Sequence, residues 1–155
     1  MTEYIHHYVE SGLDNVYIYG IPLELDDSEE ALITIPAIND LHRVIAKGII
    51  SHQNSMSGTE LRFLRTEMGL TQAQLAELVH RDKQSIGRWE RSEIELDAAA
   101  EVLIRRFAIE SLSLDLEIGI DELSKRSVPG AVTQAIAIDF DNDLVDSGRY
   151  ELRAA

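Results

Sequence analysis

Residues 56–91, MSGTELRFLRTEMGLTQAQLAELVHRDKQSIGRWER, decide the fold of this chain. Residues 57–60 (SGTE) and residues 71–74 (TQAQ) each have the spacing of a capping box, in which two side chains satisfy the free amides at the start of a helix. Asp82 is the predicted N-cap of a further helix, about eleven residues after Thr71. The stretch therefore predicts three short helices joined by tight turns, which is the arrangement of a helix-turn-helix.

Apolar residues recur at helical spacing within each of these helices, so each has one face for a core. The predicted inward residues are Leu61, Leu64, Met68, Leu75, Ala76, Val79, Ile86 and Trp89. Gly69 follows the first helix, where a residue in the left-handed conformation commonly ends a helix. The three helices can therefore share one small core.

Residues 69–91 resemble the helix-turn-helix of the Xre family, which includes the lambdoid phage repressors and many antitoxins. The positions that carry the resemblance are Gln72, Leu75, Ala76, Ile86, Trp89 and Glu90. It covers about 50 residues, roughly 57–107, and implies a lambda-repressor-like bundle that binds DNA in a bacterial or phage-encoded protein. His80 departs from the family, which usually has glycine in this turn. A histidine there must adopt a positive φ or use a different turn, at a cost of about 1 kcal/mol.

In a helix-turn-helix, the exposed residues at the start of the second helix of the pair face the major groove. The residues that we expect to contact DNA are Gln72, Lys83, Gln84, Ser85, Arg88 and Arg91. Gln84 can read adenine and Arg88 can read guanine, each by a bidentate contact that discriminates by about 1–3 kcal/mol. Gln72 and Arg91 are expected to contact phosphates. The alternative for each residue is solvated helix surface.

Glu90 needs a partner, because an acid that faced DNA would repel it. In the family, the matching glutamate pairs with an arginine on the first helix, and Arg65 occupies the matching place. The resemblance therefore implies a structural ion pair between Arg65 and Glu90.

The segment before the helix-turn-helix reads as a small α/β module. Strands are predicted at residues 4–8, 16–19 and 32–35, with an acidic loop at residues 24–30. Asn39 is the predicted cap of a helix whose inward residues are Leu41, Val44, Ile45 and Ile49. Residues 51–57, rich in serine, asparagine and glutamine, are predicted to be a linker.

The segment after Arg91 alternates helix and strand signals. Asp97 is the predicted cap of a helix in which Ala100, Leu103, Ile104 and Phe107 close the core over Trp89. A short helix is predicted at residues 120–126, strands at residues 134–140 and 149–153, and turns at residues 129–130, 141–143 and 147–148. Tyr150 and Leu152 are predicted to point inward.

The fold class predicted from these patterns is mainly α with a small β unit, or α+β, with strands from both ends in one mixed or antiparallel sheet. Three parts are expected: residues 1–55 as a dimerisation or partner-binding module, residues 56–112 as the DNA-binding domain, and residues 113–155 as an extension that packs on the first module.

Charge is distributed unevenly along the chain, whose net charge is −14. Residues 1–56 hold two basic and nine acidic side chains (−7), residues 57–110 eight and ten (−2), and residues 111–155 four and nine (−5). The acid therefore lies mainly outside the helix-turn-helix. The flanks should weaken non-specific DNA binding and can attract a basic protein.

Several kinds of site and location find no support in the sequence. The absence of cysteine excludes disulfides and cysteine-ligated zinc and fits a reducing cytoplasm. The five histidines lack metal-ligand spacing, and Leu144 and Tyr150 replace the glycine and glutamate that a calcium loop starting at Asp139 would need. No catalytic motif, signal peptide or membrane-length apolar run is present. We expect no enzymatic activity, no cofactor, no metal and no membrane contact.

Three functional hypotheses remain open. The first is a cytoplasmic repressor that binds a near-palindrome as a homodimer, with half-sites about one helical turn, ~34 Å, apart. The second is an antitoxin that masks a basic toxin and autoregulates its operon. Residues 4–21, 41–49 and 57–78 resemble regulators similar to MqsA-type antitoxins, although the cysteine-ligated zinc module of those proteins is missing. In the third, the acidic flanks are soluble surface that only dimerises the protein.

Overall fold

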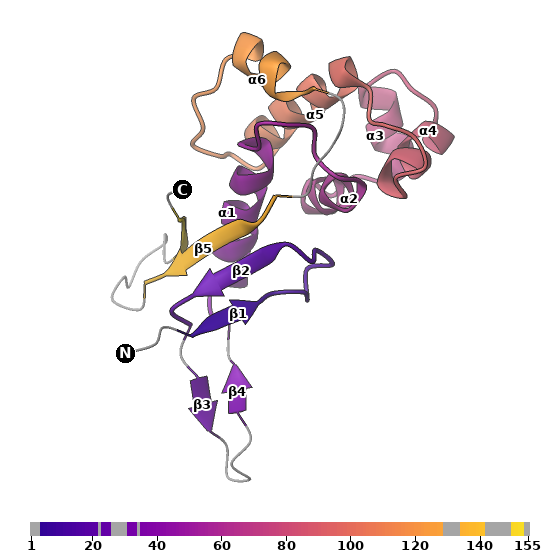
Figure 1. Ribbon diagram of the computed structural model, residues 1–155. Coiled ribbons are helices and arrows are strands. Elements are labelled where there is room, and N and C mark those ends of the chain that lie inside the picture. The colour runs from indigo at the N-terminus through magenta and orange to yellow at the C-terminus, as the bar shows by residue number, and fades with distance from the viewer. Residues whose placement is uncertain are drawn as a thin grey trace.

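The computed structural model describes residues 4–21, 23–25, 31–33, 35–128, 134–141 and 150–153 of the 155-residue chain. Its elements, in chain order, are β1 (Ile5–His7), β2 (Val16–Tyr19), β3 (Leu23–Leu25), β4 (Ala31–Ile33), α1 (Ile38–Ile50), α2 (Gly58–Glu67), α3 (Gln72–Leu78), α4 (Lys83–Glu90), α5 (Ala98–Ser111), α6 (Ile120–Arg126), β5 (Ile136–Phe140) and β6 (Tyr150–Leu152). Helices α2 to α6 gather at one end of the molecule, whereas α1 lies against the sheet (Figure 1). The predicted α+β class is confirmed.

Strands from both ends of the chain form one mixed sheet in the order β1-β2-β5-β6. β2 and β5 are parallel, whereas β1 pairs antiparallel with β2 and β6 pairs antiparallel with β5. A parallel pair needs a crossover connection, and here the long crossover contains every helix of the chain's described part. β3 and β4 form a separate antiparallel hairpin that projects away from the sheet (Figure 1).

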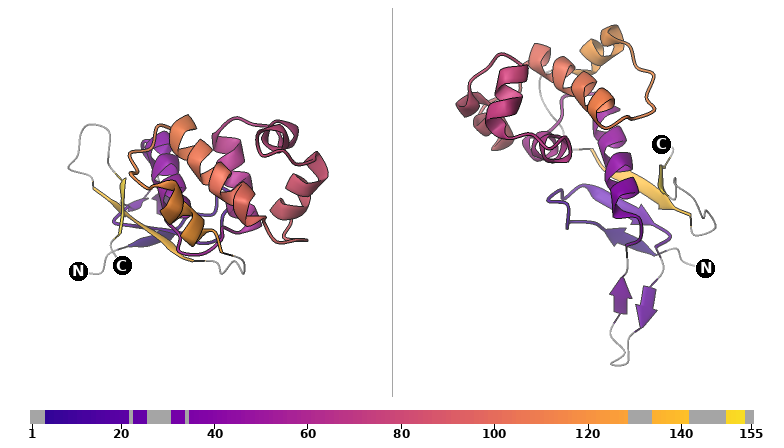
Figure 2. Two further views of the ribbon diagram at one scale, coloured as in Figure 1. Left: turned by 90° about the horizontal axis from the view of Figure 1, so that it is seen from above. Right: turned by 180° about the vertical axis from the view of Figure 1, so that it is seen from behind.

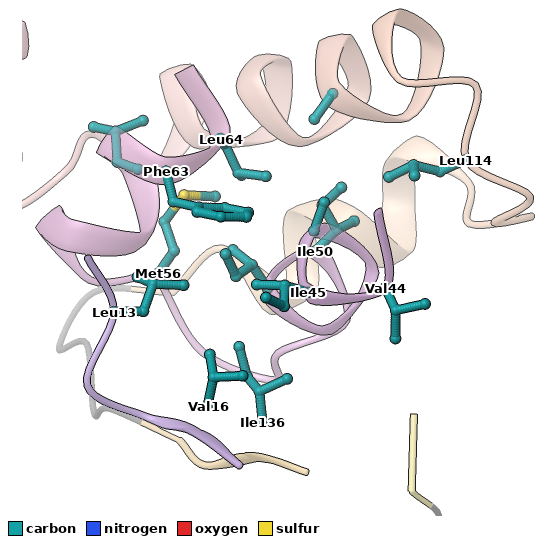
Figure 3. Packing of buried hydrophobic residues seen from close by; sticks show 14 of the residues in the cluster. Leu13, Val16, Val44, Ile45, Ile50, Met56, Phe63, Leu64, Leu114 and Ile136 are labelled. Atoms are coloured by element: carbon teal, nitrogen blue, oxygen red, sulfur yellow. The ribbon is translucent and has the colours of Figure 1, made fainter. Parts of the chain in front are cut away.

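Helix α1 covers one face of the sheet, as the view from behind in Figure 2 shows. The strands alternate, so that Val16, Ile18, Ile136 and Ile138 point toward α1 and are buried. Gly48 allows the close approach, because a Cβ there would lie 2.9 Å from Ile136 Cγ2. The buried residues continue from this layer into the helical end as one core (Figure 3). Full burial of each aliphatic side chain contributes about 1.5–3 kcal/mol.

The three central helices begin as the sequence predicted. The Ser57 and Thr71 side chains accept from the amides of Glu60 and Gln74, and both capping boxes are complete. Asp82 Oδ1 accepts from the Ser85 amide at 2.7 Å. Gly69 ends α2 with φ 72°, and His80 adopts φ 58° in the turn between α3 and α4. The turn thus keeps the left-handed conformation that the family usually gives to glycine.

Residues 51–57, predicted to be a linker, include side chains that are packed into the core. His52, Ser55 and Met56 are buried. The fully buried Arg105 of α5 donates to the carbonyl oxygens of Ile50, His52 and Asn54 at 2.9, 3.1 and 2.8 Å. Arg105 also pairs with Glu101 at 2.6 Å. Arg105 thus satisfies the carbonyls at and just after the end of α1 and joins this segment to α5, which composition alone did not predict.

Two predicted details at the N-terminal side are wrong. Asn39 does not cap α1, because the helix begins earlier and the cap position is Ala37, in the left-handed region with φ 51° and without a side-chain hydrogen bond. The predicted acidic loop at residues 24–30 begins too early, because Leu23–Leu25 pairs with Ala31–Ile33 as a strand. Hydrogen bonding between the two short segments outweighs the low strand propensity of Glu24.

The prediction that Leu103 lies in the core is also wrong. Leu103 is 42% exposed, because the inward face of α5 is fixed by Ala100, Glu101, Ile104 and Arg105 instead. Tyr150 and Leu152 both point inward as predicted: Tyr150 is buried, and Leu152, although 37% exposed on the short edge strand β6, pairs with the buried Ile138 and faces Gly48 of α1. The turns predicted at residues 129–130 and 147–148, and most of the turn at 141–143, lie outside the described residues.

Candidate nucleic-acid interface

Helix α4 has two opposite faces. Ile86 and Trp89 are buried in the core, and Lys83, Gln84 and Arg88 are exposed. This division follows from the sequence, because residues three apart on a helix share a face. α4 lies at the far edge of the helical end, away from the sheet (Figure 1). Its exposed face is therefore open to a large partner.

The exposed face of α4 and the start of α3 enclose a shallow hollow of about 340 Å³. The hollow is lined by Gln72, Lys83, Gln84, Gly87, Arg88 and Arg91. Five of the six residues predicted to contact DNA therefore lie together. The sixth, Ser85, is half-buried and does not line the hollow. Gly87 gives room to the Arg91 guanidinium, since a Cβ at position 87 would lie 3.0 Å from Arg91 Nη1.

The cations around the hollow differ in what they already contact. Within the part of the chain that the structure describes, the side chains of Lys83 and Arg88 form no hydrogen bond or ion pair. Arg91 Nε donates to Glu93 Oε1 at 2.8 Å, and both side chains are exposed. The hydrogen bond and charge of Arg91 hold the pKa of Glu93 below its usual value. Glu93 was not among the residues predicted for this site, although its negative charge two residues after Arg91 indicated a possible ion pair.

Glu90 faces away from the hollow into a network of donors. Arg65 donates to it through Nε at 2.6 Å and through Nη2 at 3.1 Å, so the ion pair expected from the resemblance is present. Arg65 Nη1 also donates to the Leu70 carbonyl at 2.9 Å. The Glu90 side chain is nearly buried, with 5% exposed. The pair thus holds α4 to α2 and keeps this negative charge from the exposed face.

Gln72 also contacts this network, because its Nε2 donates to Glu90 Oε1 at 3.1 Å. The side chain is half-buried at the start of α3 and lines the hollow. One amide hydrogen is thus directed to Glu90, while the second hydrogen and the carbonyl oxygen remain for other partners. Gln72 therefore connects the ion pair to the exposed face of α4.

A close backbone contact also fixes the C-terminal end of α4. A Cβ at Gly58 would lie 2.4 Å from the Glu90 carbonyl oxygen and 2.5 Å from that of Trp89. Only glycine allows the start of α2 to approach the end of α4 this closely. α4 is therefore held at its C-terminal end by both backbone packing and an ion pair.

Comparison with known families identifies this part of the chain. Residues 61–100 match the family model described as a helix-turn-helix. This segment is a DNA-binding helix-turn-helix domain of the Xre type. The helix-turn-helix domain spans about a quarter of the chain, and domains of this type are typical of non-enzymatic regulators. No match was found among curated proteins or among solved structures.

The described residues also offer neither a metal-binding cluster nor a membrane-spanning helix. They contain no group of three or more histidine, cysteine or acidic side chains placed to hold a metal ion. No helix among them has the length and apolar composition needed to cross a membrane.

Proposed function

We propose that the protein is a sequence-specific transcriptional repressor that reads the major groove with α4. The observation that carries this proposal is the exposed face of α4, where Lys83, Gln84 and Arg88 are gathered and their side chains form no hydrogen bond or ion pair among the described residues. These side chains are cations and amides, which are the groups that bind phosphates and base edges. The opposite face of the same helix is buried, so contact with DNA would not compete with the core.

The roles of the individual residues follow from their chemistry. Gln84 and Arg88 lie one turn apart and read base edges, each by a bidentate contact. Lys83 and Arg91 contact phosphates, and Arg91 exchanges its carboxylate partner Glu93 for a phosphate when DNA binds. Gln72 positions the start of α3 against the backbone of the duplex. Ser85 lies at the margin of the contact.

We propose further that residues 56–112 act as the DNA-binding unit and that the flanking segments join two copies. A homodimer reads an inverted repeat whose half-sites are separated by one helical turn, about 34 Å, or by a multiple of it. Support for this division comes from the charge, because the segments before residue 57 and after residue 110 carry −7 and −5 of the total of −14.

The function is tested by selecting duplexes from a random-sequence library at moderate salt. We expect an inverted repeat to be enriched. The Gln84→Ala/Arg88→Ala variant should lose this preference, while the matched Gln53→Ala/Arg62→Ala variant, which removes the same residue types from exposed positions outside the hollow, should keep it. No enrichment with the wild type, or an unchanged preference in the first variant, would contradict the proposal.

The acidity of the flanks favours a second candidate function. In this alternative, the protein is an antitoxin whose acidic flanks mask a basic toxin and whose helix-turn-helix autoregulates the operon. Co-expression with the product of the adjacent gene separates the two candidates. A stable complex that neutralises toxicity supports the antitoxin, and the absence of any complex supports the solitary repressor.

A further inference from the structure

The face of the mixed sheet opposite α1 is not covered by any described helix. We call it the outer face; it faces the viewer in Figure 1, and α1 lies behind it. Its members are Ile5, His7, Tyr17, Tyr19, Ala137, Asp139, Glu151 and Arg153. They alternate along the strands with the buried residues that contact α1.

The strand register places these residues in two cross-strand rows. In the first row, His7 lies beside Tyr17 and Tyr17 beside Ala137, and the row ends at Arg153, whose amide donates to the Ala137 carbonyl at 2.8 Å. In the second row, the order is Ile5, Tyr19, Asp139 and Glu151. Each row therefore runs from an apolar or aromatic edge at β1 to a charged edge at β6.

The composition of the outer face is that of an interface rather than of a solvated sheet. A water-facing sheet surface is ordinarily polar along each strand, but the central strand β2 presents two tyrosines here. Beside them, β5 presents Ala137 and Asp139, and Asp139 Oδ1 lies 3.6 Å from Arg153 Nε of the same chain. His7 stacks on Tyr17 with 4.6 Å between ring centroids and 9° between planes. The Arg153 guanidinium carbon lies 3.9 Å from the centroid of the Tyr19 ring. Ile5 beside them is 47% exposed. Tyrosine and arginine are enriched at interfaces, and side chains already ordered lose little entropy on binding.

The two rows are complementary to each other. A two-fold axis that lies in the interface, perpendicular to the strands and between the rows, would place the first row of one copy over the second row of another. Tyr17 would then face Tyr19, and His7 would face Ile5. Arg153 would face Glu151 of the second copy, and the axis would repeat this pair, so two attracting Arg–Glu pairs would lie along the β6 edge. Such self-complementarity is what an isologous interface requires.

We infer that the outer face is the surface by which two copies of this chain form the homodimer. The inference rests on the proposed function, which needs a two-fold partner, and it identifies where that partner binds. Both signs of charge at the β6 edge fit a second copy better than a uniformly basic protein, which would face Arg153 with like charge. α4 lies at the opposite end of the molecule from the sheet, so this contact leaves it free for DNA (Figure 1).

Charge reversal at the edge of the outer face tests the inference by sedimentation equilibrium on the full chain. We expect Glu151→Arg and Arg153→Glu each to raise the dimer Kd at least about tenfold, because like charges then face each other. The variant with both changes restores opposite charges across the axis and should return to within about threefold of the wild type. Glu110→Arg, an equal change of charge at an exposed position on α5, is the matched control and should leave the dimer unchanged.

Several results would overturn the inference: a monomeric wild type at tens of micromolar, a dimer Kd unaffected by either single reversal, or a double reversal as weak as the singles. Circular dichroism melts of all variants establish that they are folded. Binding to an isolated half-site separates this result from the proposed function. The charge reversals should leave the affinity for an isolated half-site close to that of Glu110→Arg. If the DNA proposal itself were wrong, the wild type would show no preference for the half-site over other sequences.

Discussion

Replacement of Arg65 by alanine removes the contact that holds α4 against α2. Arg65 is 14% exposed and Glu90 5% exposed, and the guanidinium donates twice to the carboxylate and once to the Leu70 carbonyl. In the variant, Glu90 would keep the Gln72 amide as its remaining side-chain donor among the described residues. The result is a nearly buried carboxylate without a countercharge.

The size of the effect follows from this burial. Removal of one partner from a buried ion pair costs about 3–5 kcal/mol, and the partial exposure of Arg65 favours the lower end of that range. For a chain of this length, each kcal/mol lowers the Tm by about 2–4 °C. We therefore expect Arg65→Ala to lower the free energy of unfolding by about 3 kcal/mol and the Tm by about 6–12 °C.

Thermal unfolding followed by circular dichroism measures this shift, and Arg62→Ala is the matched control. Arg62 lies on the same helix, is exposed, and forms no hydrogen bond or ion pair within the described ranges, so its loss should change stability by less than about 0.5 kcal/mol. Well below its Tm, the Arg65 variant should keep the base preference of the wild type. If the two variants melted at the same temperature, the structural role of the Arg65–Glu90 pair would be refuted.

Three further predictions concern the DNA-contacting face, the packing of α4 and acid stability. Arg88→Ala should relax base preference at one position of the half-site. Lys83→Ala should instead weaken binding to all DNA sequences alike and reduce the slope of log Kd against log salt by about one. If anisotropy titrations gave the same effects for both variants, these roles would be contradicted. Gly58→Ala should cost about 1–3 kcal/mol in urea unfolding, because the new Cβ would overlap the Trp89 and Glu90 carbonyls, and an unchanged midpoint would oppose this. Burial alone raises the pKa of Glu60, but the hydrogen bond and charge of His52, with bonds from Ser57 and Asn15, outweigh it and leave the pKa below 4.5. The carboxylate therefore stabilises the fold above pH 4.5, and this contribution is lost as pH falls through the lower folded-state pKa. Glu60→Gln should be less stable than the wild type at neutral pH. In melts at a series of pH values, its Tm should fall less steeply toward acid pH than that of the wild type.

The helix-turn-helix could be predicted almost completely from local chemistry. Both capping boxes, the Asp82 cap and the left-handed residues Gly69 and His80 are set by residues a few positions apart. The two faces of α4 follow from helical spacing in the same way. The clustering of Gln72 with the α4 residues was predictable because the turn between α3 and α4 is short.

Features that depend on distant residues were not predictable. The parallel pairing of β2 with β5 joins segments more than a hundred positions apart. Arg105 and Glu101 were not expected inside, because their burial is favourable only when the carbonyls of residues 50, 52 and 54 are placed around them. Leu103 was predicted to lie in the core because helical spacing shows which residues share a face, but it does not show which face of the helix points toward the core. The two rows of the outer face likewise appear only once the register is known.

The central claim, that the exposed face of α4 reads DNA sequence, is tested most directly by one ratio of affinities. The Kd of the wild type for its selected duplex is compared with that for a scrambled duplex of equal length at one fixed salt concentration. We predict at least about a thousandfold discrimination by the wild type and a loss of about a hundredfold or more of it in Gln84→Ala/Arg88→Ala, the sum of two bidentate contacts. Equal affinity of the wild type for both duplexes, or full discrimination by the variant, would contradict the claim.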